Sequence, residues 1–158
     1  MSEQPSWVSI ERTFNAPIDR VWKMWATPEG FASWYGPHGA NIPTCNMDVQ
    51  VGGKRLVSMA METPNGPMQM WFAGEFLEIT PMTRLVYTEA MSDENAIPTP
   101  PQDMGMPAGT DVSTQVVVEL VDHGDSTTMK MTHVGVPADS PGGQGWASAF
   151  EKLEAALA

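Results

Sequence analysis

The stretch "MAMETPNGPMQMW", residues 59–71, places apolar residues at alternate positions on both sides of a proline-glycine segment. Alternation with period two is typical of a half-buried β-strand, and "PNGP" provides the turn that joins two antiparallel strands. The stretch therefore predicts a β-hairpin, with a turn on Asn65 and Gly66 or on the longer segment 64–67.

Both turns give the same pairing, in which Met61 faces Met70 and Met59 faces Phe72. Because side chains alternate across a strand, one face of the hairpin is mostly apolar and carries Val57, Met59, Met61, Met70, Phe72 and Gly74. The other face is more polar and carries Ser58, Ala60, Glu62, Gln69, Trp71 and Glu75. We therefore expect the methionine face to point inward. Methionine fills irregular space and also recurs on adaptable binding surfaces, so this face is either core filler or the lining of a site.

The same period-two pattern, bounded by turn residues, extends along most of the chain. It predicts strands at residues 7–14, 44–49, 54–62, 68–79, 84–90, 113–121 and 127–134. In the last of these, Met129, Met131 and His133 share one face. That spacing again places methionine on the inward side.

Helix signals occur near the two ends of the chain. Pro17 and Asp19 open a first helix, and Thr27, Pro28 and Glu29 open a short second one that ends at Gly36-Pro37. Residues 141–158 form a final helix with one apolar stripe, Trp146, Phe150, Leu153 and Leu157. Strands in succession with helices at both ends indicate an α+β fold with a mainly antiparallel sheet.

Residues 91–112 break this rhythm, because their prolines and glycines argue against a regular element. Loops of this length are either functional lids or disordered. We expect a flap over a pocket, since the segment carries four large apolar residues: Met91, Ile97, Met104 and Met106.

Composition limits the classes of function. The chain has 158 residues, of which 42% are hydrophobic, which suits one domain over residues 1–158. A net charge of −11 argues against nucleic acid and against an anionic membrane surface as partners. Cys45 is the single cysteine and no run reaches membrane-spanning length, so we expect a cytoplasmic protein.

A few polar residues could carry chemistry. His133 shares the inward face, and we expect a structural hydrogen-bonding histidine, with a ligand contact or acid-base role as the alternative. Glu89 could be a desolvated base, but we expect it at a strand end that leans into solvent, and Arg55 to be a charge at the sheet edge. Cys45 is expected to be a small buried hydrophobe. His38, His123, His133 and Cys45 show no metal-ligand spacing, so we expect no metal and no cofactor.

An ordered set of segments resembles a known superfamily. "ERTFNAPIDRVW" from Glu11 is similar to the first strand and helix of the SRPBCC (START-like, birch-allergen-like) proteins. Six further segments, in order along the chain, resemble the AHSA-type branch of that superfamily: "FASWYGP", "VGGK", "GEFLEITP", "RLVYT", "MTHVGVP" and "GWASAFEKL". This branch is named for an activator of a heat-shock chaperone ATPase.

The resemblance implies a helix-grip fold, in which a curved antiparallel sheet wraps around a long C-terminal helix and two short helices follow the first strand. It also implies a cavity between sheet and helix, with Trp34 and Tyr35 near its mouth. The expected ligand-binding residues are Trp34, Val57, Met59, Met61, Met70, Phe72, Tyr87, Met131, His133, Trp146 and Phe150.

The resemblance does not supply a substrate. Binding of a small hydrophobic molecule is our first expectation. Two alternatives remain: an enzyme of cyclase or lyase type acting on a hydrophobic substrate, and a co-chaperone-like protein that stimulates a chaperone ATPase. The assembly state, including a homodimer, is left open.

Overall fold

The computed structural model describes residues 7–104, 107, 113–138 and 141–157. Within these residues, seven strands form one antiparallel sheet in the order β1-β7-β6-β5-β4-β3-β2. The strands are β1 (Trp7–Phe14), β2 (Asn41–Met47), β3 (Lys54–Thr63), β4 (Gly66–Thr80), β5 (Arg84–Ser92), β6 (Thr114–Asp122) and β7 (Thr127–Pro137). The helices are α1 (Ile18–Ala26), α2 (Pro28–Ala32) and α3 (Pro141–Leu157).

The helices begin where the local sequence favours a start. Pro17 precedes α1 and Asp19 lies in its first turn. Thr27 caps α2, because its hydroxyl oxygen accepts a hydrogen bond from the backbone N–H of Gly30 at 3.0 Å, while Pro28 occupies the first helical position. These local signals confirm the predicted starts of both helices.

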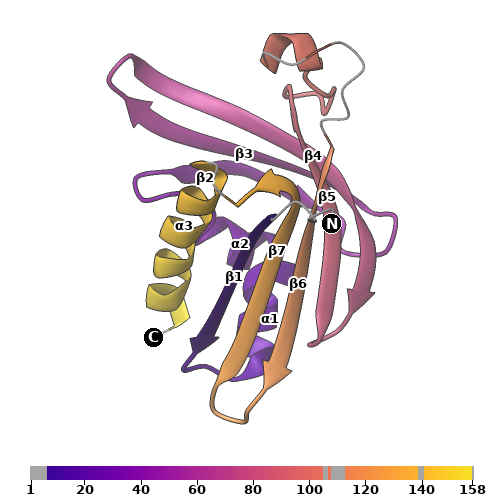
Figure 1. Ribbon diagram of the computed structural model, residues 1–158, viewed down its shortest axis with the longest axis vertical. Helices are drawn as coiled ribbons and strands as arrows, with labels where there is room; N and C mark the ends of the chain where they lie inside the picture. Colours follow the sequence, from indigo (N-terminus) through magenta and orange to yellow (C-terminus); the bar gives the residue numbers. More distant parts are fainter. Residues whose placement is uncertain (1–6, 105–106, 108–112, 139–140, 158) are drawn as a thin grey trace, which may run out of the picture.

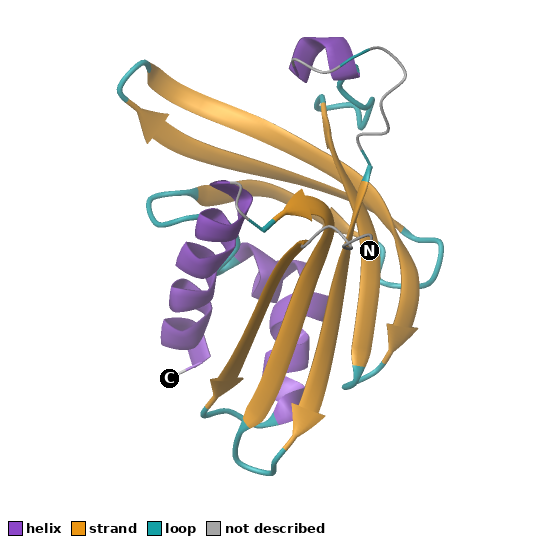
Figure 2. Ribbon diagram, in the orientation of Figure 1, coloured by secondary structure: helices purple, strands orange, loops and turns teal. Residues whose placement is uncertain are grey.

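The sheet curves around the helices, as Figures 1 and 2 show. Its concave face carries the buried positions of the strands and receives side chains from all three helices. The indole N–H of Trp25 from α1, for example, donates to the sulfur of Met129 on β7 at 3.2 Å. The predicted α+β helix-grip fold is confirmed.

The hairpin forms as predicted, but its pairing differs by two residues. Met59 faces Met70, rather than Phe72, and Met61 faces Met68. The reason is that the turn lies one residue earlier than expected. Thr63 pairs with Gly66, and the Thr63 hydroxyl donates to the Gly66 carbonyl at 2.6 Å, so the two residues between the strands are Pro64 and Asn65. A shift of two residues keeps every side chain on its predicted face.

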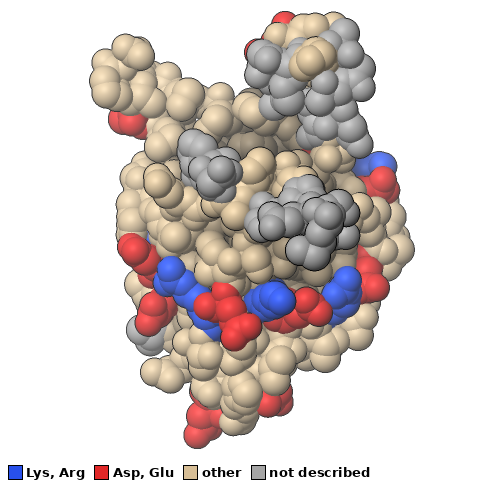
Figure 3. All heavy atoms as spheres, in the orientation of Figure 1, with Lys and Arg blue, Asp and Glu red and all other residues tan. Residues whose placement is uncertain are grey.

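On β1, β7, β6 and β5, the convex face of the sheet carries alternating charges. A row of Lys, Arg, Asp and Glu side chains crosses the front of the molecule in Figure 3. Across the strands, Glu11 pairs with Lys130, Lys130 with Glu119, and Glu119 with Arg84. Arg84 also forms ion pairs with Glu78 and Glu119. Opposite charges alternate along this row, so the convex face here is a solvated surface.

The segment that follows β5 contains little regular structure in its described part. Strand β5 runs to Ser92, which forms an isolated bridge with Pro98, and one 3₁₀ turn, η1, spans Pro101–Met104. Figure 1 shows this segment beyond the end of β5. No helix among the described residues is long and apolar enough to cross a membrane.

Candidate functional site

A pocket of about 180 Å³ lies between the concave face of the sheet and the first turns of α3. We call it the α3 pocket. Strands β3, β4, β5 and β7, the residues after α2, and α3 supply its walls. It is lined by Tyr35, Gly36, Pro37, Met59, Phe72, Glu89, His133, Val136, Gly145, Trp146 and Ala149.

The predicted site residues divide into three groups. On the pocket wall lie Met59, Phe72, His133 and Trp146. Five others lie away from the wall and are at most 1% exposed: Trp34, Val57, Tyr87, Met131 and Phe150. The remaining two, Met61 and Met70, are half-buried on the hairpin: Met70 pairs with Met59, and Met61 lies nearer the hairpin tip. The methionines therefore serve both as core filler and as lining.

The resemblance placed Trp34 and Tyr35 near the mouth; Tyr35 lines the pocket, but Trp34 is fully buried away from it. Gly145, Val136 and Ala149 were not identified as lining residues. Ala149 lies one helical turn after Trp146, so the helical period was an available signal. The small size of Gly145 and Ala149 was also a signal, because small side chains on the inward face of a helix leave space.

The rim of the pocket is held against α3 by polar contacts. The ammonium group of Lys152 donates to the backbone carbonyls of Tyr35 at 3.2 Å and Pro37 at 3.3 Å. Partial burial lowers the pKa of Lys152. On the surface, His38 and Glu151 form a contact of 2.9 Å. These contacts hold the residues after α2 against the helix.

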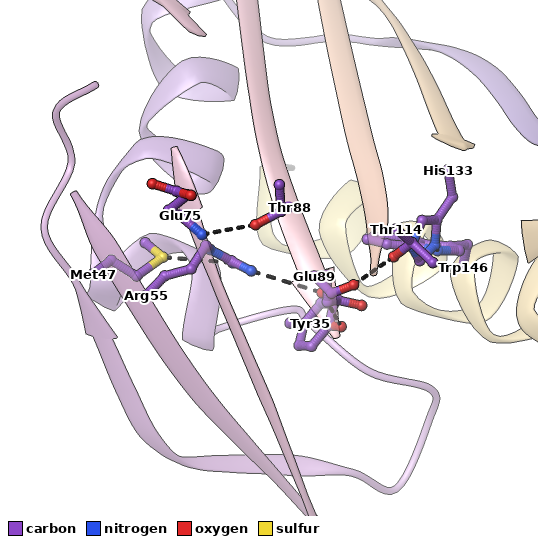
Figure 4. Close-up of polar contacts among 9 residues, drawn as sticks. All are labelled: Tyr35, Met47, Arg55, Glu75, Thr88, Glu89, Thr114, His133 and Trp146. Atoms are coloured by element: carbon purple, nitrogen blue, oxygen red, sulfur yellow. Dashed lines mark hydrogen bonds and ion pairs between the residues drawn. The ribbon is translucent and has the colours of Figure 1, made fainter. Parts of the chain in front are cut away.

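His133 belongs to a directed chain of hydrogen bonds, drawn in Figure 4. The indole N–H of Trp146 can only donate, so Nδ1 of His133 accepts at 2.9 Å and the ring proton resides on Nε2. That N–H meets the Thr114 hydroxyl at 2.8 Å, and the hydroxyl donates to the Glu89 backbone carbonyl at 2.7 Å. Burial lowers the pKa of His133, which also favours the neutral ring. Both ring nitrogens are thus engaged, in keeping with the structural histidine expected from the sequence.

Glu89 points inward, which corrects the expectation that it leans into solvent. It is 6% exposed, and its Oε2 accepts a hydrogen bond from the Tyr35 hydroxyl at 3.1 Å. The expectation was wrong because β5 continues to Ser92, so Glu89 is not at the strand end. Burial and the neighbouring Glu89 raise the pKa of Tyr35.

Arg55 is 2% exposed and is not at the sheet edge, because β2 pairs with β3 on its outer side. Its guanidinium lies over the ring of Tyr87, 3.8 Å from the ring centroid, and 5.0 Å from that of Phe31. Nη1 lies 3.7 Å from Oε2 of Glu89, so the two side chains form a buried ion pair (Figure 4). The prediction of an edge charge was therefore wrong.

The buried ion pair leaves hydrogen-bonding groups without partners. Among the described residues, Nε and Nη1 of Arg55 and the hydroxyl of Tyr87 make no hydrogen bond. Burial raises the pKa of Tyr87. Unpaired buried donors are uncommon in proteins and often mark places where water or a ligand belongs.

A second, wider hollow of about 1150 Å³, the outer groove, is lined by residues of β2 to β5, by Pro28 of α2 and by part of the segment after β5. Leu56, Ala73 and Ala90 lie on the convex face of the sheet, whereas Met47 and Arg55, which pair across β2 and β3, lie on the inward face. The segment after β5 contributes Ala96 and Pro98. The described part of that segment thus lines the outer groove and adds no residue to the α3 pocket. The expectation that this segment forms a flap over the pocket is therefore wrong for its described residues. Of its four apolar residues, Met106 lies outside them.

The remaining candidate residues show no metal chemistry. Within the described ranges, no group of three or more His, Cys, Asp or Glu side chains could hold a metal ion. Cys45 is half-buried, and burial raises its pKa. A thiol with a raised pKa is a poor nucleophile.

The fold and the sequence both have recognisable relatives. The sequence profile of the family described as "Activator of Hsp90 ATPase homolog 1-like protein" matches residues 15–158. A protein from Nitrosomonas europaea has a similar structure, with 23% identity over 94% of this chain and 92% of that chain and a TM-score of 0.72.

Two further solved structures are similar. A protein from Arthrobacter aurescens has 25% identity over 94% of this chain and 84% of that chain, with a TM-score of 0.72. The AHSA1 protein from Silicibacter pomeroyi has 17% identity over 96% of this chain and 97% of that chain, with a TM-score of 0.68. These likenesses concern the fold. No curated protein matches this chain.

Proposed function

This chain belongs to the family of Activator of Hsp90 ATPase homolog 1-like proteins, and on that premise we propose that it binds a small, largely apolar molecule in the α3 pocket. Proteins of this family and fold commonly bind hydrophobic ligands. The observation that carries the proposal is the pocket itself, which interrupts a core packed elsewhere with aromatic rings.

The size of the pocket limits the ligand. An engineered protein cavity of about 150 Å³ accepts benzene, whereas pockets for drug-sized molecules begin at about 300 Å³. The α3 pocket, at about 180 Å³, therefore suits a molecule with one ring or a short branched chain. Met59 on its wall has three rotatable bonds and can adapt to a somewhat larger body.

A catalytic role for His133 has less support. The ring nitrogens of His133 are both engaged, by Trp146 and by Thr114, so this residue has no free lone pair for a general base. Ligand binding requires no such group and remains the function that the pocket favours.

The proposal is tested by filling the pocket. A Cβ atom added at Gly145 would meet no heavy atom within 4 Å, and Gly145 lines the pocket. We therefore expect Gly145→Leu to fold and to occupy the space that a ligand needs. Titration with toluene, followed by calorimetry, should show an affinity at least about tenfold lower than that of the unsubstituted protein.

The matched control is Ala156→Leu, which adds a similar side chain to an exposed position of α3. This variant should bind toluene like the unsubstituted protein. Equal toluene affinity in Gly145→Leu, or no saturable toluene binding by the unsubstituted protein, would contradict the proposed function.

A further inference from the structure

Among the side chains that line the α3 pocket, one carries a charge and has hydrogen-bonding capacity left, the carboxylate of Glu89. A carboxylate offers about four acceptor sites, and the Tyr35 hydroxyl uses one of them. The contact with Arg55 Nη1, at 3.7 Å, is an ion pair and is too long for a hydrogen bond. Of the other polar side chains on the wall, His133 has both ring nitrogens engaged, and the Tyr35 hydroxyl already donates to Glu89.

Arg55 determines which charge the pocket accepts. Its guanidinium is permanently protonated and buried, and Arg55 is not among the residues that line the pocket. It therefore lies behind Glu89 and acts as its counter-ion. An anionic ligand would meet the carboxylate, while a cationic ligand would compete with a guanidinium that already balances that carboxylate.

We propose that the ligand is a neutral molecule with an apolar body and one hydroxyl group, an alcohol or a phenol, that donates a hydrogen bond to the Glu89 carboxylate. This inference rests on the proposed function and specifies its ligand class. The rings of Tyr35, Phe72 and Trp146 contact the body, and Glu89 receives the hydroxyl. Arg55 is a positioning residue, because it acts on the ligand only through Glu89.

The test compares ligands of similar size by calorimetry on the unsubstituted protein. Toluene has no polar group, phenol has a donor, and anisole has only an acceptor. A hydrogen bond to a charged acceptor should make phenol bind at least about tenfold more tightly than toluene. Anisole should bind no more tightly than toluene, and benzoate and benzylammonium should bind more weakly than phenol.

A double variant provides the matched control. Glu89→Met with Arg55→Met removes both charges together, so no buried charge is left without a partner. Both changes keep a long side chain of similar size. The readout is the ratio of the phenol and toluene affinities within this variant, which should fall to about one because the charged acceptor is gone. Glu89→Gln retains a neutral acceptor and should reduce that ratio in part.

The outcomes separate the two claims. If toluene does not bind the unsubstituted protein, the proposed function fails and the inference fails with it. If toluene binds, but phenol binds no more tightly or the preference survives in the double variant, the inference alone is overturned. Tighter binding of benzylammonium than of phenol would also overturn it.

Discussion

The interior of this protein has two halves that use similar side chains and pack them differently. Under α1 and α2, the rings of Trp25 and Trp34 lie 4.8 Å apart and those of Phe31 and Trp34 lie 5.3 Å apart, with no exposed area above 1%. Under the first turns of α3, Met59 and Trp146 instead border a pocket of about 180 Å³. We call these regions the packed half and the pocket half.

The difference lies in the small residues of the pocket half. Gly145 and Ala149 lie on the α3 wall, and Gly36 lies at the rim. A Cβ atom at Gly36 would come within 3.1 Å of the Met59 methyl group, and its φ of +86° is a region that side chains disfavour. The comparison teaches that a methionine is filler or lining according to the size of the residues opposite it.

The largest effect is expected where the two halves meet, at the buried pair of Arg55 and Glu89. Glu89→Met leaves the guanidinium buried without a counter-charge, so the free energy of unfolding should fall by about 3–5 kcal/mol. Chemical denaturation measures this loss.

The control for this change is the exposed pair of Lys54 and Glu75, at 3.5 Å. Because solvent screens exposed charges, Glu75→Met should change the free energy of unfolding by less than about 1 kcal/mol. Similar losses for Glu89→Met and Glu75→Met would mean that the buried pair has no special role.

A second prediction compares one methionine from each half. Met129 is fully buried and accepts a hydrogen bond from Trp25. Met129→Ala should therefore lower the free energy of unfolding by an amount near the upper end of about 2–5 kcal/mol. Met59 already borders a pocket, so Met59→Ala should cost a value in the lower part of that range and should weaken toluene binding. Denaturation and calorimetry on both variants provide the measurement. A larger loss of stability for Met59→Ala than for Met129→Ala would show that Met59 is a packed core residue and does not border a pocket.

A third prediction concerns pH. Burial lowers the pKa of His133 in the folded protein, against an opposing attraction to Glu89. The unfolded chain therefore binds a proton near the ordinary value of about 6.5 while the folded protein does not. The free energy of unfolding should fall as the pH decreases through that value, and the fall should end below the folded pKa.

The measurement is denaturation at about pH 7.5 and about pH 5.5. In the unsubstituted protein, the free energy of unfolding should be lower at the lower pH, and His133→Gln should reduce this difference by about 1 kcal/mol. His123→Gln, at an exposed turn, is the control and should leave the difference unchanged. If the free energy of unfolding falls by the same amount in His133→Gln, then the folded protein binds a proton on His133 as readily as the unfolded chain does.

The smallest effect is expected at Gly145. Gly145→Ala adds a methyl group in open space and replaces the poorest ordinary helix former, so the free energy of unfolding should rise by about 0.5–1 kcal/mol. Thermal denaturation can detect a change of this size. A decrease would mean that the space beside Gly145 is not free.

Local patterns were enough to predict most of the fold. Strand β1 was predicted with its observed ends, since period-two alternation is strong there, and the cap of α2 was visible in Thr27 and Pro28. The hairpin faces were also predicted, although the pairing was not. Its register depended on whether the two turn residues were Pro64 and Asn65 or Asn65 and Gly66, and the sequence pattern favoured the second pair.

The polar part of the site could not be predicted in the same way. Spacing along β5 placed Glu89 with Tyr87 on the inward face, but a carboxylate alone favours solvent. Its burial depends on Arg55, which lies on β3, with β4 between them. Such a pairing is fixed by the sheet order and by contacts between distant segments. For the same reason, the sequence did not reveal whether the space under α3 was filled.

The central claim is that a ligand binds in the pocket half and not in the outer groove. Methionine labelled with ¹³C at its methyl group reports on both places, because Met59 lines the α3 pocket and Met47 lines the outer groove. During titration with toluene, the account predicts that the Met59 methyl signal shifts with saturation while those of Met47 and Met129 stay in place. A saturable shift at Met47 without one at Met59 would contradict it.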